Sequence, residues 1–138
     1  MGFNKAVEGI APDKRGARPP GFEHSVWQLV EHLRIAQEDI LEFCVNPKYE
    51  HNLNWPDDYW PKNPAPEDDK TWIQSIASFE RTRDELKQIA RDVTDLTAPV
   101  PTGNGTQTYL RAILLAADHV AYHVGQIVLV RRGLGIWP

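Results

Sequence analysis

The 138-residue sequence lacks what several classes of protein require. Its one cysteine, Cys44, excludes an internal disulfide framework and favours a reducing, cytoplasmic environment. It has no run of about 18 apolar residues, and residues 1–20 lack the apolar segment of a signal peptide, so we expect no membrane span or leader. Acidic residues outnumber basic ones, 19 to 15, which argues against a nucleic-acid partner bound through a basic face.

Proline and tryptophan, in contrast, are abundant, with 11 and five residues. Most prolines lie outside the segments with helical periodicity, which leaves three long amphipathic segments. Each predicts a helix, the first over residues 25–45, the second from 68 or 69 to 93–96, and the third over 106–132. A short helix over residues 3–10 precedes a predicted turn and loop over 13–21. No segment alternates with a period of two, so we predict a single all-α domain over residues 1–138.

Residues 46–68, between the first two long helices, form a long connection rich in proline and aromatic residues. A flexible linker would be rich in Gly and Ser instead. A structureless loop of this length is unusual unless it is functional or packs by its own side chains. The rings of Tyr49, Trp55, Tyr59 and Trp60 are therefore predicted to cover one end of the bundle.

The third helix contains two histidines, His119 and His123, at a spacing of four residues. Residues four apart lie one turn apart on the same face of a helix, so both imidazoles can bind one metal ion. Zinc proteases use the same spacing with a Glu directly after the first histidine, but Val120 stands there, which excludes that activity. The other interpretation is that both histidines are polar edges of a helix without a ligand.

Two histidines do not complete a transition-metal site, and His32 of the first long helix is the best third candidate. Helical-wheel geometry places it on the flank of the apolar stripe, where it can face a neighbouring helix. Three protein ligands leave a coordination position open, as in catalytic metal sites. Gln126 lies on the same face as His123 and is predicted to orient water or a ligand there.

Arg83 lies within the apolar stripe of the second long helix. Its side chain either reaches the edge of the core with its charge in water, or binds an anion in a cavity near the site.

Two segments, His24–Gln37 (HSVWQLVEHLRIAQ) and Asp118–Gln126 (DHVAYHVGQ), carry a family resemblance. They resemble the signature stretches of the DinB-like (YfiT-like) superfamily, whose members are four-helix bundles with a divalent metal held by three histidines. The resemblance extends from about Phe3 to the C-terminus and implies His32, His119 and His123 as the ligands.

The same resemblance implies two kinds of chemistry. Characterised relatives include thiol-dependent isomerases and thiol transferases, so we expect a metal-dependent hydrolase or thiol transferase acting on a small molecule. The expected cofactors are a divalent ion, Zn or Ni first, and a low-molecular-weight thiol. The alternative is a non-enzymatic dimeric helical protein, involved in binding or stress, with a structural or vestigial histidine site.

This chain departs from the family at its N-terminus, where about eight residues replace a full-length first helix. Either the bundle lacks most of one helix or the natural chain begins further upstream. The third helix is apolar almost all round, and one chain with three long helices can hardly cover it. We therefore predict a homodimer in which the small residues Ala117, Ala121 and Gly125 contribute to the interface.

Overall fold

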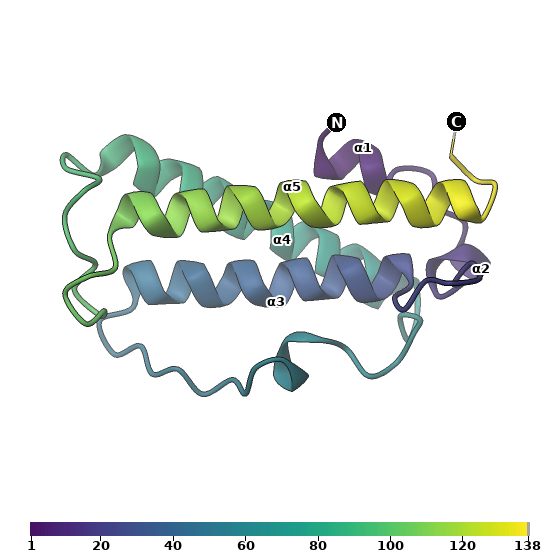
Figure 1. Ribbon diagram of the computed structural model, residues 1–138, viewed down its shortest axis with the longest axis horizontal. Helices are drawn as coiled ribbons and strands as arrows, with labels where there is room; N and C mark the ends of the chain where they lie inside the picture. Colours follow the sequence, from purple (N-terminus) through teal and green to yellow (C-terminus); the bar gives the residue numbers. More distant parts are fainter. Residues whose placement is uncertain (138) are drawn as a thin grey trace.

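A computed structural model describes residues 1–137 as a helical bundle (Figure 1). Three long helices lie alongside one another: α3 (Val26–Val45), α4 (Asp69–Asp92) and α5 (Tyr109–Gly133). Two short helices, α1 (Phe3–Val7) and α2 (Pro12–Arg15), lie toward the end of the bundle where the chain finishes. No strand occurs within residues 1–137, so the predicted all-α fold with a shortened N-terminal helix is confirmed.

Side-chain caps fix where the long helices begin. Ser25 and Gln28 form a reciprocal capping box at α3: the Gln28 amide donates to Ser25 Oγ at 3.2 Å, and the Ser25 amide donates to Gln28 Oε1 at 3.1 Å. Asp68 caps α4, so that this helix begins at residue 69, in agreement with the predicted start at 68 or 69. The last helix begins at Tyr109, three residues later than predicted, because Thr108 is its cap and the preceding backbone bonds to Val100.

The N-terminal prediction is wrong in two details. The first helix ends at Val7 and not at Ile10, and Gly9 follows in the left-handed region with a φ of 71°. The short helix α2 begins at Pro12 and extends into the 13–21 segment that was predicted to be turn and loop. Proline suits this first helical position because its missing N–H has no partner there.

The long connection between α3 and α4 runs along the side of α3 and does not cover one end of the bundle, as the sequence had suggested (Figure 1). The reason is topological, because α3 and α4 run in the same direction and the chain must travel back along the bundle between them. One 3-10 turn, η1 (Asp57–Tyr59), interrupts the connection. It lies against the middle of α3, where the candidate site is found.

The core lies where α3 meets α4 and α5. Its largest fully buried apolar residues are Leu29, Leu33, Phe79 and Ile127. The ring of Phe3 lies 3.9 Å from that of Phe79, so α1 packs onto this core.

The outward side of α5 stays largely uncovered. Leu114, Tyr122 and Leu129 are 58%, 63% and 52% exposed. The sequence analysis expected no membrane span. By length and composition, however, α5 is the one helix among the described residues that could cross a membrane, and 28% of its most apolar 18-residue window is buried. Apolar helices of soluble proteins pass the same test, so the result alone does not separate a membrane contact from a protein contact.

Candidate metal centre

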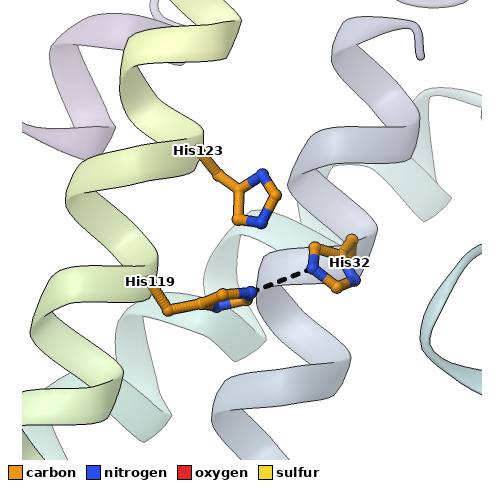
Figure 2. A group of neighbouring side chains, drawn as sticks. All are labelled: His32, His119 and His123. Carbon is orange, nitrogen blue, oxygen red and sulfur yellow. Dashed lines mark hydrogen bonds between the residues drawn. The ribbon is translucent and has the colours of Figure 1, made fainter. Parts of the chain in front are cut away.

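Three histidines converge in the space between α3 and α5 (Figure 2). His119 and His123 project from successive turns of α5 toward α3, and His32 faces them from α3. One ring nitrogen from each lies within 4.8 Å of the others, and His32 Nε2 lies 2.9 Å from His119 Nε2. The structure thus brings together the three histidines singled out in the sequence.

Packing of α3 against α5 holds these rings in place. His32 is 1% exposed and His123 is 6% exposed, while His119 is half-buried. Burial lowers the pKa of His32 and of His119 to about 4, and it also lowers the pKa of His123. All three imidazoles are therefore neutral at pH 7, which is the form that binds a metal ion.

Each of two rings has a hydrogen bond on the nitrogen that points away from the cluster. His32 Nδ1 lies 2.8 Å from the carbonyl oxygen of Tyr59, and His123 Nδ1 lies 2.6 Å from Oε1 of Gln126. Because a carbonyl oxygen only accepts, both Nδ1 atoms donate, and each Nε2 lone pair is left for a ligand. Gln126, predicted to orient water or a ligand, thus orients His123.

Trp60 covers the α3 side of the cluster. Its ring stacks on His32 at 3.8 Å and on His24 at 3.9 Å, so that it lies between the two imidazoles. The sequence marked the aromatic loop as packed but did not connect it to the site. The sequence does contain a hint of this contact. Tyr59 and Trp60 lie in a loop that runs along α3, and α3 carries His32.

A carboxylate ties the same loop to α3. Asp39 accepts hydrogen bonds from the hydroxyls of Tyr49 at 2.8 Å and Tyr59 at 2.6 Å. Burial, followed by the bond to Asp39, raises the pKa of both tyrosines, so they remain protonated donors. Tyr59 is therefore fixed by its side chain to Asp39 while its carbonyl fixes His32.

Arg83 and the chain's two other histidines lie outside the cluster. The guanidinium of Arg83 donates to Asn4 of α1 at 2.8 Å, which places it at the contact between α1 and α4. His24 stacks on the far side of Trp60, and the exposed His51 lies 3.0 Å from the hydroxyl of Tyr49. Neither of these two histidines belongs to the group of possible ligands.

The donor set fits a transition-metal ion. Imidazole nitrogens bind Zn, Ni, Cu and Fe, with bonds of about 2.0–2.1 Å for Zn. Tetrahedral bonds of that length place ligand nitrogens roughly 3.4 Å apart. The observed separations, 2.9 Å for one pair and at most 4.8 Å across the group, bracket this distance, so the three nitrogens are close enough to hold one ion.

Comparison with known proteins adds the family. The family model for the DinB superfamily matches residues 1–127, which include all three histidines. The chain belongs to the DinB superfamily. No curated protein and no solved structure matches the chain. The three-histidine cluster of this DinB-superfamily protein is thus described from its own geometry.

Proposed function

We propose that this DinB-superfamily protein is a metal-dependent enzyme, a hydrolase or a thiol transferase, that acts on a small molecule at the three-histidine cluster. The observation that carries the proposal is the convergence of three neutral imidazoles without a carboxylate or thiol among the possible ligands in the described residues. Structural zinc sites are usually closed by four protein ligands, whereas three leave a position for a reactant.

A divalent ion held by His32, His119 and His123 would supply Lewis acidity, which lowers the pKa of a coordinated water or thiol toward neutrality. Neighbouring side chains and one backbone carbonyl fix the orientation of the histidine ligands. Tyr59 and Gln126 fix the tautomers of His32 and His123, and Trp60 shields His32 from water. Zn²⁺ and Ni²⁺ are the ions we propose first.

A thiol reaction would require a low-molecular-weight thiol from solution. The chain's one thiol, Cys44, packs with Val100 and Ala112 in a separate part of the core. It lies 12 residues from His32 along α3, which corresponds to about 18 Å of helix. Burial raises the pKa of Cys44 to about 11, so it is neither placed nor ionised for such a role.

The second candidate is a non-enzymatic dimeric binding or stress-related protein in which the histidine site is structural or vestigial. The exposed apolar side of α5 is the observation behind this candidate, because a surface of this kind is typical of a site for protein interaction. In either case we propose a cytoplasmic protein without a nucleic-acid or membrane partner, as its single cysteine and acidic composition suggest.

The test begins with metal analysis of untagged protein purified under metal-replete conditions. One equivalent of metal per chain, lost in His123→Ala, supports the metal site. The loaded protein is then assayed against ester and amide substrates and, with an added small thiol, against an electrophile. Turnover that disappears with His123→Ala supports an enzyme, and its thiol dependence separates a transferase from a hydrolase. Stoichiometric metal without turnover, or no metal at all, favours the second candidate.

A further inference from the structure

A small apolar pocket lies directly beside the candidate metal site. Its volume is about 250 Å³, and it is formed by α3, α5 and the loop between α3 and α4. The residues that matter for its chemistry are Asp39, Ile40, Trp55, Tyr59, Leu115 and His119. Because His119 is both a possible ligand and part of this wall, a molecule in the pocket contacts a metal-binding imidazole.

Two of the residues that line the pocket, Trp55 and Leu115, are large apolar side chains exposed to solvent. Trp55 is 71% exposed, yet its ring is held at 5.3 Å from that of Tyr59 in an edge-to-face contact. Leu115, on α5, is 49% exposed. Apolar side chains that surround a hollow next to convergent polar groups are typical of a ligand site.

The polar group in the wall is already satisfied. Both oxygens of Asp39 accept a tyrosine hydroxyl, from Tyr49 and from Tyr59. These two bonds fix the carboxylate in place at the edge of the pocket, with both tyrosine hydroxyls as its donors. Tyr59 itself is 7% exposed and is fixed at its side chain and its carbonyl, so the wall is rigid. Apart from Asp39 and His119 the lining is apolar or aromatic, so most of the wall suits an uncharged group.

We propose that this pocket is the substrate subsite, and that it binds a small uncharged aromatic or branched aliphatic group of a substrate whose reacting group lies on the His119 side. The inference rests on the proposed function and adds the substrate class to it. The volume is below the roughly 300–1,000 Å³ of pockets for drug-sized ligands, so it accommodates one ring or branched chain and not a whole cofactor.

One experiment compares two metal-binding probes on the Zn-loaded protein by calorimetry. Acetohydroxamate and benzohydroxamate share a chelating group and differ in the apolar group that the pocket would hold. We expect benzohydroxamate to bind at least about tenfold more tightly, because its phenyl ring leaves water. Trp55→Ala and Leu115→Ala should remove most of this difference without changing metal content or acetohydroxamate affinity. Ile73→Ala, an exposed apolar residue of α4 outside the pocket, is the matched control.

A second experiment uses benzyl alcohol, which has no chelating group, on the metal-free protein. Amide and indole resonances of Ile40, Trp55, Tyr59 and Leu115 should shift together and saturate. Equal affinity of the two hydroxamates for loaded protein, or no effect of Trp55→Ala, overturns the subsite while the metal site stands. If the protein binds no metal, the proposed function fails, and the benzyl alcohol shifts alone decide for or against the pocket.

A separate observation concerns the outward side of α5, which we call the outer face and define by Leu114, Asp118, Ala121, Tyr122, Gly125, Val128, Leu129 and Arg132. All but the half-buried Val128 are exposed. A groove of about 690 Å³ crosses it beside Met1. At Gly125 a Cβ would meet nothing within 4 Å, so a second backbone can approach closely.

The charged residues of the outer face can pair between two copies of the chain. In an antiparallel pair of α5 helices with a two-fold axis at Gly125, residues equally distant from it meet. Asp118 of one copy, seven residues before, then faces Arg132 of the other, seven residues after, and Ala121 faces Leu129 in the same way. Within residues 1–137 neither Asp118 nor Arg132 has an ion-pair partner. A lipid surface would leave Asp118 in apolar surroundings, which is costly.

We infer that the outer face binds a second copy of this chain across a two-fold axis near Gly125. Sedimentation velocity should show a dimer at micromolar concentration. Asp118→Arg and Arg132→Asp should each give monomers, because like charges then meet twice across the axis. Mixed in equal amounts, the two variants should form a heterodimer of wild-type mass, since both contacts become opposite in charge. Asp92→Arg, on the exposed side of α4, is the matched control and should leave the dimer intact.

Three results would overturn this interface. They are a wild-type monomer at 100-fold higher concentration, variants that remain dimeric, and a mixture that stays monomeric. Sedimentation of monomeric wild-type protein with anionic vesicles would likewise overturn it and assign the outer face to a membrane.

Discussion

The two sides of α5 have similar apolar content but different roles. The side that faces α3 holds the fully buried Ile127 and Val130 together with His119 and His123. The outer face holds Leu114, Tyr122 and Leu129, all more than half exposed. Apolar periodicity alone does not distinguish the two, because α5 is apolar almost all round. The difference arises from what the chain packs against each side.

On the inner side, burial and polar chemistry depend on each other. The imidazoles remain neutral because packing excludes water, and they keep their orientation because Tyr59 and Gln126 accept from their outer nitrogens. On the outer face the one side-chain hydrogen bond among residues 1–137 is the long contact of 3.4 Å from Gln126 to the Tyr122 hydroxyl, so most of its residues are available to a partner. A sharp test therefore changes one side and leaves the other intact.

The largest expected effect is on metal binding from the inner side. His123→Ala should weaken metal affinity by more than about 100-fold, because even outer-shell partners of a ligand contribute 10- to 100-fold. Metal analysis of untagged protein measures this. Leu114→Ala, on the outer face, should retain full metal content, and equal loss in both variants would contradict the division into two sides.

Stability should show the same contrast. Ile127→Ala removes a fully buried side chain and is expected to cost about 2–4 kcal/mol of unfolding free energy. Leu114→Ala should change it by less than about 0.5 kcal/mol, because Leu114 is 58% exposed. Urea denaturation at submicromolar concentration, where a dimer would dissociate, gives both values. A large cost at Leu114 under these conditions would mean that its surroundings within the chain are more closed than they are in this structure.

A smaller effect on metal affinity is expected from Gln126, the hydrogen-bond partner of His123. Gln126→Ala leaves His123 Nδ1 without its acceptor and should weaken metal affinity by about tenfold. Competition with a chelator of known affinity measures the change. Gln88→Ala, which affects only an exposed contact with Asp92 on α4, should have no effect.

The last prediction extends the comparison to the buried side of α3 and concerns the reactivity of Cys44, where no metal binding or stability is lost. Burial raises its pKa to about 11, so the thiol is protonated at neutral pH and reacts only as pH approaches that value. Alkylation by iodoacetamide at pH 8 should be at least about tenfold slower in the folded protein than in the urea-unfolded chain. Equal rates would show that this end of the core opens readily.

Much of the fold could be predicted because its signals are local. Ser25 and Gln28 predict the start of α3, and the spacing of apolar residues predicts all three long helices. The start of α5 was missed because Thr106 and Thr108 are both plausible caps, and the backbone bond from Val100 to Gln107 selects the second. The course of the 46–68 loop was missed because it depends on the direction of α4 relative to α3.

For the site, the sequence determined the ligand types and the pairing of His119 with His123, because a spacing of four residues fixes a shared face in any helix. It also marked His32 as the third candidate. Only the tertiary structure decided that His32 meets the pair, that Trp60 and Tyr59 support it, and that one side of α5 remains open. Those contacts join residues from 27 to 87 positions apart, and no local pattern encodes such separations.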